Sequence, residues 1–329
     1  MTEFPTLQAL YDAHTGFVSD KWASYIPVYA RLFNEFRDTP LKLLEIGVQN
    51  GGSLEIWSKY FHNAEKIVGC DINQSCDRLQ FDSTKISLFL GDINDTNILT
   101  DIKALTPEFD IIVDDGSHLS SDIIKSFSHL FSSLAYDGLY VAEDLHCGYW
   151  AEYEGGLDDP TSCISFFKTL ADIVNFEHWG IPVSRIERLS SFCINAGLTE
   201  ALLSDIYSVE FINSICVVRR KRAADIQLGS RIVRGQTALV VPVQHLDGSL
   251  SQAPVQRLSE ANFAAENNLD NSSHDAIASG AKHDKNAEIL AVQTKKLDAL
   301  EAEQLELREQ LTVAETQLAL LKELILKKG

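Results

Sequence analysis

The sequence contains no uninterrupted apolar run near the roughly 20 residues that a membrane-spanning helix requires. Residues 1–16 also lack the basic stretch and the apolar run that together form a signal peptide. We therefore predict a protein that has neither a membrane span nor a secretion signal.

Cysteine pairs with the CxxC spacing of zinc and redox sites are also missing. The six cysteines are isolated from one another: Cys70, Cys76, Cys147, Cys163, Cys193 and Cys216. Scattered thiols argue against structural zinc, and they are typical of proteins from reducing compartments. The sequence therefore predicts a cytoplasmic protein whose cysteines are reduced and mostly buried.

Positive charge is scarce. The 329 residues include 28 lysines and arginines against 47 aspartates and glutamates, which gives a formal net charge of −19 and a sequence pI near 4.8. A surface this acidic repels phosphate backbones, so we expect no nucleic-acid partner. The same acidity also serves solubility, and it identifies no partner by itself.

Residues 1–222 alternate short apolar runs with segments of helical spacing. The runs predicted as strands are 43–46, 66–70, 86–90, 111–113, 139–142, 209–212 and 215–218. Stretches between them, such as 53–61 and 123–134, show the apolar spacing of helices. This alternation indicates one α/β domain with a doubly wound, Rossmann-like sheet.

Two further segments follow this domain. Residues 223–287 are rich in Ser, Asn, Gln and Asp and are predicted as a mostly irregular linker, although the apolar run 238–243 also fits an added strand. In residues 288–327, leucines recur at alternating spacings of three and four. This pattern predicts a C-terminal coiled-coil helix and hence a homo-oligomer. A single amphipathic helix packed on the α/β domain is the alternative.

Two acidic clusters each follow a predicted strand. The first runs from Asp114 to His118, directly after 111–113, and the second runs from Glu143 to His146, directly after 139–142. The carboxyl ends of parallel strands meet at one edge of a sheet, so we expect both clusters in one crevice. Carboxylates this close repel one another unless a cation or a shared proton compensates. A divalent metal with oxygen ligands is the simplest such cation.

A glycine-rich turn follows the first predicted strand and contains Gly47 and Gly51. Its spacing differs from the GxGxxG of dinucleotide enzymes, which argues against a nicotinamide-dependent oxidoreductase. Acids follow the second and third strands at Asp71 and Asp92, where carboxylates can meet ribose hydroxyls and an adenine amino group. We therefore predict an adenosyl ligand without a pyrophosphate, contacted by Glu45, Gly47, Gly51, Asp71 and Asp92.

With these features the chain resembles the class I S-adenosylmethionine-dependent methyltransferases, and more closely the magnesium-dependent sugar O-methyltransferases of the macrolide type. The matching stretches are 19–22, 43–52, 110–118, 141–150 and 211–220. The pairing of the two acidic clusters is the most specific part of the match. The resemblance covers residues 15–220 and says nothing about the C-terminal third.

The resemblance implies S-adenosylmethionine and Mg²⁺ as cofactors. It places the metal ligands on Asp115, Glu143 and Asp144, and oxygen ligands are those that Mg²⁺ prefers. It places the general base on His118, and histidine is suited to this role because it titrates near neutrality. His146 stays open as an alternative base or as a substrate contact.

The roles of several neighbouring residues are less specific. Asp114 either joins the site or caps the next helix. Tyr149 and Trp150 either form a wall for sugar stacking or, in the case of Trp150, pack in the interior. The resemblance alone assigns Lys21 and Trp22 to an N-terminal lid over the cofactor.

The combined features predict a metal-dependent O-methyltransferase that moves a methyl group from S-adenosylmethionine to a sugar hydroxyl. Because a coiled coil suggests docking to a glycan-assembly complex, we expect the sugar or glycan acceptor to be a bacterial surface polysaccharide. O-methylation of a secondary-metabolite glycoside is one alternative. A non-catalytic methyltransferase-fold scaffold that recruits partners is another, although a scaffold has no physical need for clustered carboxylates.

Overall fold

The computed structural model describes residues 4–192, 194 and 197–256. These residues belong to the first of two compact units, which spans residues 1–260, while the second spans residues 261–329. The predicted coiled coil at 288–327 and the part of the predicted linker after residue 256 lie outside the described residues.

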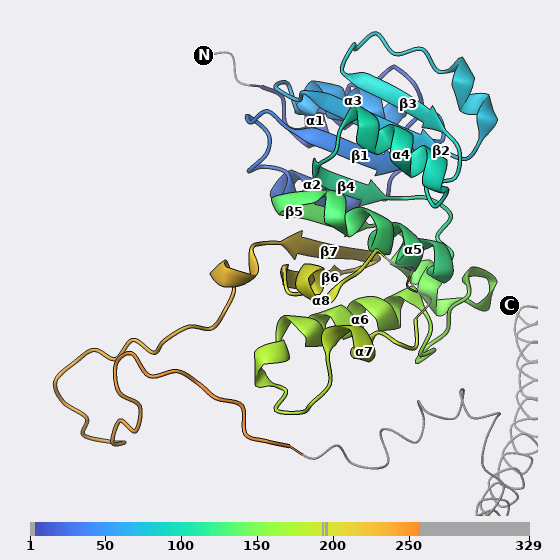
Figure 1. Ribbon diagram of the computed structural model, residues 1–329. Helices are drawn as coiled ribbons and strands as arrows, with labels where there is room; N and C mark the ends of the chain where they lie inside the picture. Colours follow the sequence, from blue (N-terminus) through green and yellow to red (C-terminus); the bar gives the residue numbers. More distant parts are fainter. Residues whose placement is uncertain (1–3, 193, 195–196, 257–329) are drawn as a thin grey trace, which may run out of the picture. The chain divides into compact units, whose positions relative to one another are not determined.

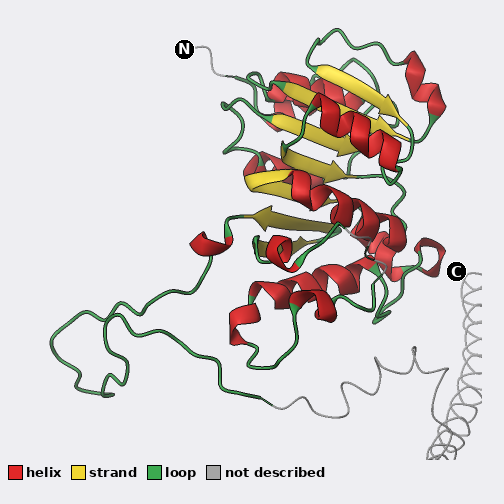
Figure 2. Cartoon of the chain, viewed as in Figure 1, coloured by secondary structure: helices red, strands yellow, loops and turns green. Residues whose placement is uncertain are grey.

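The described strands form one seven-stranded sheet in the order β3-β2-β1-β4-β5-β7-β6 (Figures 1 and 2). The strands are β1 (Lys42–Ile46), β2 (Lys66–Asp71), β3 (Ile86–Leu90), β4 (Phe109–Asp114), β5 (Leu134–Ala142), β6 (Ile206–Ile212) and β7 (Ile215–Arg220). Strands β1 to β5 pair in parallel, and β7 runs antiparallel to both β5 and β6. The Rossmann-like sheet predicted from the sequence is confirmed, and each predicted strand lies within an observed one.

Helices cover both faces of the sheet (Figure 1). They are α1 (Leu7–Asp12), α2 (Tyr25–Leu32), α3 (Gly52–Tyr60), α4 (Thr96–Leu105), α5 (Ser120–Leu130), α6 (Cys163–Val174), α7 (Arg185–Arg188) and α8 (Glu200–Leu203). Side chains alternate between the faces along each strand: Leu43 and Ile111 pack with α1 to α3, whereas Leu44 and Ile112 pack with α4 to α6. Because both faces are buried, the central strands read as continuous apolar runs in the sequence.

Helix α2 is held against α3 by aromatic packing around Trp57, which is fully buried. The Trp57 ring lies 5.4 Å from that of Tyr29 and 5.6 Å from that of Phe33, both in edge-on arrangements. Replacing a buried aromatic side chain of this size with alanine typically destabilises a protein by about 3–5 kcal/mol. This packing fixes the position of α2, which matters below because α2 carries two residues of the candidate site.

The strand order changes direction between β1 and β4, since the chain adds β2 and β3 on one side of β1 and then returns to the other side. At such a point the turns after neighbouring strands lead to opposite faces and leave a crevice between them. The turn after β1 and both acidic clusters therefore lie at the same edge of the sheet.

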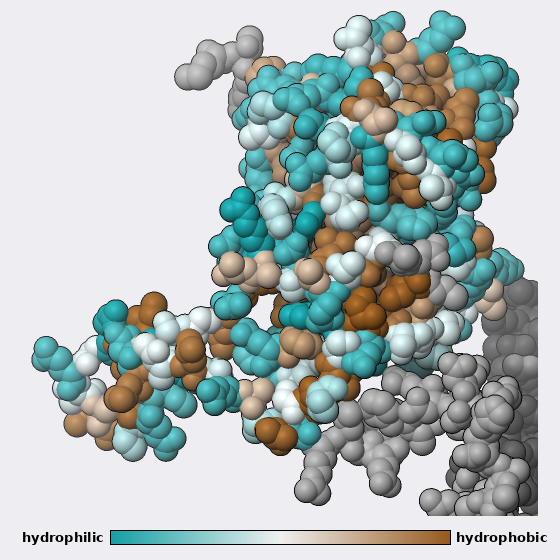
Figure 3. Space-filling view, in the orientation of Figure 1, coloured by the Kyte–Doolittle hydropathy of each residue, from teal (hydrophilic) through white to brown (hydrophobic). Residues whose placement is uncertain are grey.

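The linker segment has no helix or strand among residues 226–256, apart from an isolated bridge between Ser230 and Leu250. The run 238–243, which also fitted an added strand, forms none. Its apolar side chains are exposed, with Leu239 at 89% and Val240 at 92%. Figure 3 shows apolar residues on the surface of the extended loop that this segment forms.

Two other expectations can be compared with the described residues. No helix in the described part of the chain combines the length and apolar character needed to cross a membrane. The cysteines in this part are free and buried: Cys70, Cys76, Cys147, Cys163 and Cys216. Burial raises the pKa of the Cys70 thiol to about 12, so this side chain behaves as an inert core residue.

Candidate active site

A cavity of about 600 Å³ opens at the carboxyl ends of β1 to β5. Its lining combines residues that follow these five strands with residues Val18–Trp22. A volume of this size is typical of sites for small molecules and cofactors. The predicted residues that line it are Gly47, Asp71, Asp92, Asp115, His118, Glu143 and Asp144.

One half of the cavity, the cofactor half, is formed by the turns after β1, β2 and β3. Asp71 Oδ2 accepts hydrogen bonds of 2.8 Å from the N–H groups of Val48 and Gln49, which join the β2 end to the β1 turn. Asp92 Oδ1 accepts a 2.8 Å hydrogen bond from the N–H of Asn94. Gly47 has a φ of 85°, and a Cβ at this position would lie 1.9 Å from the carbonyl oxygen of Asp115. Only glycine fits this turn.

Glu45 and Gly51 do not line the cavity, although both are predicted cofactor contacts. Glu45 is fully buried beneath the turn, where its Oε2 accepts hydrogen bonds from Ser53 Oγ at 2.9 Å and Trp57 Nε1 at 3.2 Å. Gly51 precedes α3 with a φ of 83°, and a Cβ there would approach the Phe81 ring to 2.9 Å. This arrangement favours a structural role for both residues, and direct cofactor contact by them stays a prediction.

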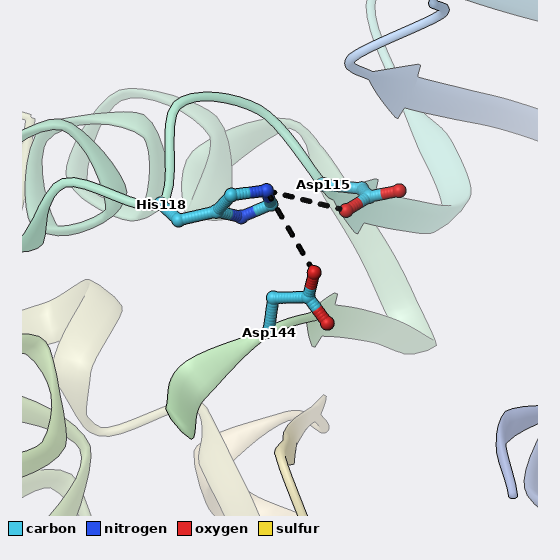
Figure 4. Close-up of side chains that lie close together, drawn as sticks. All are labelled: Asp115, His118 and Asp144. Carbon is cyan, nitrogen blue, oxygen red and sulfur yellow. Dashed lines mark ion pairs between the residues drawn. The ribbon is translucent and has the colours of Figure 1, made fainter. Parts of the chain in front are cut away.

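The other half of the cavity, the metal half, brings together Asp115, His118 and Asp144 (Figure 4). His118 Nε2 lies 3.9 Å from Asp115 Oδ1 and 3.8 Å from Asp144 Oδ2. Each residue offers one ligand atom, and these atoms lie within 4.8 Å of one another. Two hard carboxylate oxygens and one imidazole nitrogen at this separation fit a divalent cation.

Backbone strain accompanies two of these residues. His118 has a φ of 58° and Asp144 a φ of 51°, in the left-handed region that side chains other than glycine adopt at a free-energy penalty. Asp144 directly follows Glu143, whose N–H is bound to the carbonyl oxygen of Asp114 at the end of β4. The chain reverses sharply there, which turns the carboxylate of Asp144 back toward His118.

Glu143, predicted as the third metal ligand, faces a buried lysine instead of His118. Lys21 Nζ lies 2.7 Å from Glu143 Oε1, 2.5 Å from Asp115 Oδ2 and 3.5 Å from Glu45 Oε1. Glu143 Oε1 also accepts a short hydrogen bond from the hydroxyl of Tyr29. The role of Glu143 as a metal ligand therefore stays a prediction. To bind a metal, Glu143 would have to use its other carboxylate oxygen, or Lys21 would have to move.

Charge in this cluster is unbalanced, because three carboxylates surround one ammonium. Burial by itself lowers the pKa of Lys21, but Glu143, Asp115 and Glu45 outweigh it and hold that pKa well above its usual value. Burial also raises the pKa of Glu143 to about 8, although the Lys21 charge opposes this. A bound cation would add the positive charge that favours the ionised form of Glu143.

Asp144 is held by a polar network from distant parts of the chain. Its Oδ1 accepts hydrogen bonds from Tyr25 Oη at 2.7 Å and from Trp22 Nε1 at 3.1 Å. The Tyr25 hydroxyl also contacts Ser214 Oγ at 2.8 Å, and that oxygen lies 2.6 Å from His146 Nδ1. His146 thus sits behind Asp144 and does not line the cavity, whereas His118 does.

Asp114 does not cap α5, since the N-cap position of that helix is Leu119. The side chain is 4% exposed at the end of β4, and its Oδ2 accepts a 2.6 Å hydrogen bond from Tyr140 Oη. Burial raises the pKa of Asp114 to about 7. Asp114 also lines the cavity, so of its two interpretations the structure favours the one in which it joins the site.

Aromatic side chains surround the metal half. The His146 ring packs edge-on against Trp22 at 6.0 Å and against Trp150 at 5.0 Å, and Tyr153 lies 6.4 Å from the ring of His118. Trp22 is 59% exposed and Trp150 50%, so Trp150 is not an interior residue. These side chains form a rim of exposed apolar surface beside the carboxylates.

Sequence reasoning missed Tyr25 and Tyr29 altogether. Together with Lys21 they are spaced by four residues, so the spacing of one helical face was visible in the sequence. Both tyrosines lie in α2, and their hydroxyls reach Asp144 and Glu143. Ser214 carried no signal, because a serine in a turn between strands is ordinary.

No family model matches the chain. The 8-demethyl-8-alpha-L-rhamnosyl tetracenomycin-C 2'-O-methyltransferase of Streptomyces olivaceus is 36% identical over 47% of this chain and 42% of its own length. The demethylmacrocin O-methyltransferase of Streptomyces fradiae is 36% identical over 53% of this chain and 46% of its own length. The chain therefore spans less than half the length of these curated relatives.

Solved structures agree with these matches. The MycE methyltransferase from the mycinamycin biosynthetic pathway, in complex with Mg, SAH and mycinamycin VI, has a TM-score of 0.53 and 27% sequence identity. The match covers 67% of this chain and 54% of that chain. A second crystal form of MycE with Mg and SAH gives a TM-score of 0.54 at 26% identity. The resemblance predicted from the sequence is confirmed.

Proposed function

We propose that this chain, whose α/β region is related to the class I sugar O-methyltransferases, transfers a methyl group from S-adenosylmethionine to a sugar hydroxyl. We infer Mg²⁺ as its second cofactor. The observation that carries the proposal is the convergence of Asp115, His118 and Asp144 in the same cavity as Asp71 and Asp92. Methyl transfer to a hydroxyl requires that the cofactor and the acceptor lie next to each other. A cavity that combines a cofactor site with a general base and possible metal ligands meets this requirement.

The cofactor half fits an adenosyl group. Asp71 and Asp92 both line the cavity, and each is held by backbone N–H groups that leave further acceptor capacity on the carboxylate. Asp71 would bind ribose hydroxyls, and Asp92 the adenine edge. S-adenosylmethionine supplies an activated methyl group on a sulfonium. Its positive charge suits a cavity lined by so many acids.

The metal half fits a divalent cation by the chemistry of its donors. Asp115 and Asp144 would hold it, with Glu143 as the third ligand through its other oxygen, and His118 would stay beside the cation as the base. Such a cation supplies positive charge that lowers the pKa of a nearby sugar hydroxyl. Hydrogen bonds fix one oxygen of Asp115 and one of Asp144. The fixed carboxylates would in turn restrict the orientation of the bound acceptor.

His118 is the proposed general base. Its Nε2 is close to both carboxylates but beyond hydrogen-bond distance of either, at 3.9 and 3.8 Å. The nitrogen is therefore available to accept a proton from a hydroxyl placed between them. His146 is the weaker candidate, because its Nδ1 contacts Ser214 and its side chain stands outside the cavity.

The acceptor proposed is a sugar on a secondary-metabolite glycoside. The matched relatives bear names of glycoside O-methyltransferases, which favours this alternative over a surface polysaccharide. The exposed rim of Trp22 and Trp150 beside the carboxylates suits the apolar face of a sugar ring and a hydrophobic aglycone. Oligomerisation through the coiled coil, docking to a glycan-assembly complex and a cytoplasmic location stay predictions.

A non-catalytic scaffold is the second candidate, and the site argues against it. Asp144 and His118 adopt strained backbone conformations, and Lys21 is buried among carboxylates. Strain and buried charge destabilise a fold and persist where function requires them.

Methyl transfer can be tested with the purified full chain, S-adenosylmethionine, MgCl₂ and a panel of glycosides and glycans. We expect transfer to a sugar hydroxyl that EDTA abolishes and excess Mg²⁺ restores. Asp115→Asn should retain cofactor binding but lose the metal response. Full transfer in EDTA would overturn the metal-dependent mechanism, and an enzyme that methylates only polysaccharides would overturn the choice of acceptor.

A further inference from the structure

The two carboxylates of the metal half divide their oxygens in the same way. Asp115 Oδ2 accepts a hydrogen bond from Lys21 Nζ at 2.5 Å, while its Oδ1 lies 3.9 Å from His118 Nε2. Asp144 Oδ1 accepts hydrogen bonds from Tyr25 Oη at 2.7 Å and from Trp22 Nε1, while its Oδ2 lies 3.8 Å from His118 Nε2. One oxygen of each carboxylate is thus bound to residues 21–25. The other faces His118, as Figure 4 shows.

All three outward partners belong to one short stretch of the chain, residues 21–25. Lys21 is 3% exposed as a side chain, and Tyr25 is 1% exposed, so neither is a mobile surface group in this arrangement. Their donors are buried at the carboxylates, where a hydrogen bond is stronger than at a water-exposed position. The stretch therefore sets the orientation of both carboxylates.

The residues just before this stretch line the same cavity and reach the start of α3. Residues Val18–Trp22 form one wall, and Val18 accepts a 3.2 Å hydrogen bond from the N–H of Gly52, the first residue of α3. The N–H of Phe17 donates to Glu55 Oε2 at 2.8 Å. Residues 17–25, the N-terminal segment, thus run from the glycine turn after β1 to the carboxylate of Asp144.

We propose that Lys21 and Tyr25 are positioning residues for the metal, and that the N-terminal segment couples metal binding to binding of the S-adenosyl cofactor. The proposal rests on the proposed function, because it requires both ligands. A cofactor bound in this cavity would contact Val18–Trp22 and stabilise the segment in its observed position, in which it holds the inward oxygens of Asp115 and Asp144 in place. Each ligand therefore tightens the binding of the other.

Two magnitudes follow from general behaviour. Removing a hydrogen-bond partner that orients a metal ligand typically weakens metal binding about 10–100-fold. Coupling between two sites typically changes affinities by about 5–150-fold, and the factor must be equal in both directions because the two binding steps share one thermodynamic cycle.

Calorimetric titration of the full chain tests the coupling. The dissociation constant of Mg²⁺ is measured with and without saturating S-adenosylhomocysteine, and that of S-adenosylhomocysteine with and without saturating Mg²⁺. We expect both constants to fall, by the same factor of about 5 or more. Equal Mg²⁺ affinity in the presence and absence of S-adenosylhomocysteine would overturn the coupling.

Tyr25→Phe tests the positioning role, since it removes one hydroxyl and leaves the buried ring. We expect it to weaken Mg²⁺ binding about 10–100-fold and to reduce the coupling factor toward one, while binding of S-adenosylhomocysteine without metal stays unchanged. Tyr60→Phe is the matched control, because Tyr60 ends α3 and packs against Arg37 away from the carboxylates. Wild-type Mg²⁺ affinity in Tyr25→Phe overturns the role of Tyr25.

Ser214→Ala provides a second variant if Tyr25→Phe fails to fold. It removes the 2.8 Å contact that fixes the Tyr25 hydroxyl and should weaken Mg²⁺ binding in the same direction by a smaller factor. Unchanged affinity there counts against the network. The outcomes are distinguishable from failure of the proposed function: a chain that binds no S-adenosylhomocysteine refutes both proposals, whereas independent binding of the two ligands refutes only this one.

Discussion

The two halves of the cavity are built in different ways. In the cofactor half, Asp71 is held by N–H groups 23 and 22 residues away, and Asp92 by one only 2 residues away. In the metal half, Lys21 and Asp115 are 94 residues apart, and Tyr25 and Asp144 are 119 apart. The partners in the first half lie within 23 residues of one another in the sequence. The second depends on side chains that only the complete fold brings together.

The electrostatics differ in the same way. Asp71 ends β2 and Asp92 lies in the turn after β3, and both carboxylates line the cavity and accept hydrogen bonds from backbone N–H groups. Glu143 is 1% exposed and the Lys21 side chain 3%, so the metal half carries charge in the interior. Changes in the metal half should therefore affect both chemistry and stability, whereas changes in the cofactor half should affect mainly binding.

The largest effect on catalysis is expected from His118→Ala. Turnover should fall by roughly 10²–10⁴-fold, the usual contribution of a positioned general base, while the affinity for S-adenosylhomocysteine stays at the wild-type value. Steady-state kinetics and calorimetry on the same preparation check both parts. His146→Ala is the comparison variant, and a larger loss there than in His118→Ala would exchange the two roles.

Lys21→Met should produce the largest loss of stability. Without the ammonium, Glu143, Asp115 and Glu45 lose their common counter-charge, and breaking a buried ion pair in this way costs about 3–5 kcal/mol of unfolding free energy. Denaturant unfolding measures the change. Lys59→Met, on the exposed side of α3, is the control and should stay within about 0.5 kcal/mol of the wild type. If both substitutions lowered the free energy of unfolding equally, the buried charges of the metal half would not contribute specially to stability.

Asp71→Ala should act mainly on cofactor binding, although it also removes the acceptor for the N–H groups of Val48 and Gln49. Loss of a carboxylate that hydrogen-bonds a ligand typically removes about 1.5–3 kcal/mol, so the dissociation constant of S-adenosylhomocysteine should rise about 10–100-fold. Mg²⁺ affinity measured without the cofactor should not change. A large drop in that Mg²⁺ affinity would mean that the two halves are not separate structural units.

The smallest effect concerns the opposite end of β4 from Asp115. Burial raises the pKa of Asp110 above its usual value, although the N–H of Lys42 donates to its Oδ2 at 2.7 Å. The folded state then binds more protons than the unfolded state above pH 3.8, so stability contributed by this group falls as the pH rises through the folded pKa. Asp110→Asn should equal the wild type at low pH and be slightly more stable at pH 7.

Thermal unfolding between pH 4 and 8 measures this difference. A variant whose stability parallels the wild type at every pH would show that Asp110 does not titrate differently on folding. The amide of asparagine still accepts the Lys42 hydrogen bond, so the comparison isolates the charge.

Much of the fold was predictable, because its signal is local. Buried parallel strands such as 111–113 leave continuous apolar runs, and the acids after them are read directly from the sequence. For the same reason the two acidic clusters were expected in one crevice, and Asp115, His118 and Asp144 do line one cavity, together with Asp71 and Asp92.

What was not predictable depends on long-range contacts. Glu143 pairs with Lys21, which is 122 residues away, and the sequence near either residue does not indicate this pair. Glu45 was expected at the cofactor because it precedes the glycine turn. Alternation along β1 places its side chain instead in the layer beneath α3, with Ser53 and Trp57. The run 238–243 has strand-like composition but no neighbouring strand, and β-propensity alone does not form a strand.

The contact between Tyr25 and Ser214 joins residues 189 apart, from α2 before the first strand and from the turn between the last two. During synthesis on the ribosome the early part of the chain is made first, and the sheet can begin to form from β1 to β5. The Tyr25–Ser214 contact, however, can form only after the β6–β7 hairpin has been synthesised. The hydroxyl that donates to Asp144 therefore gains its contact with Ser214 only when the last two strands have been made.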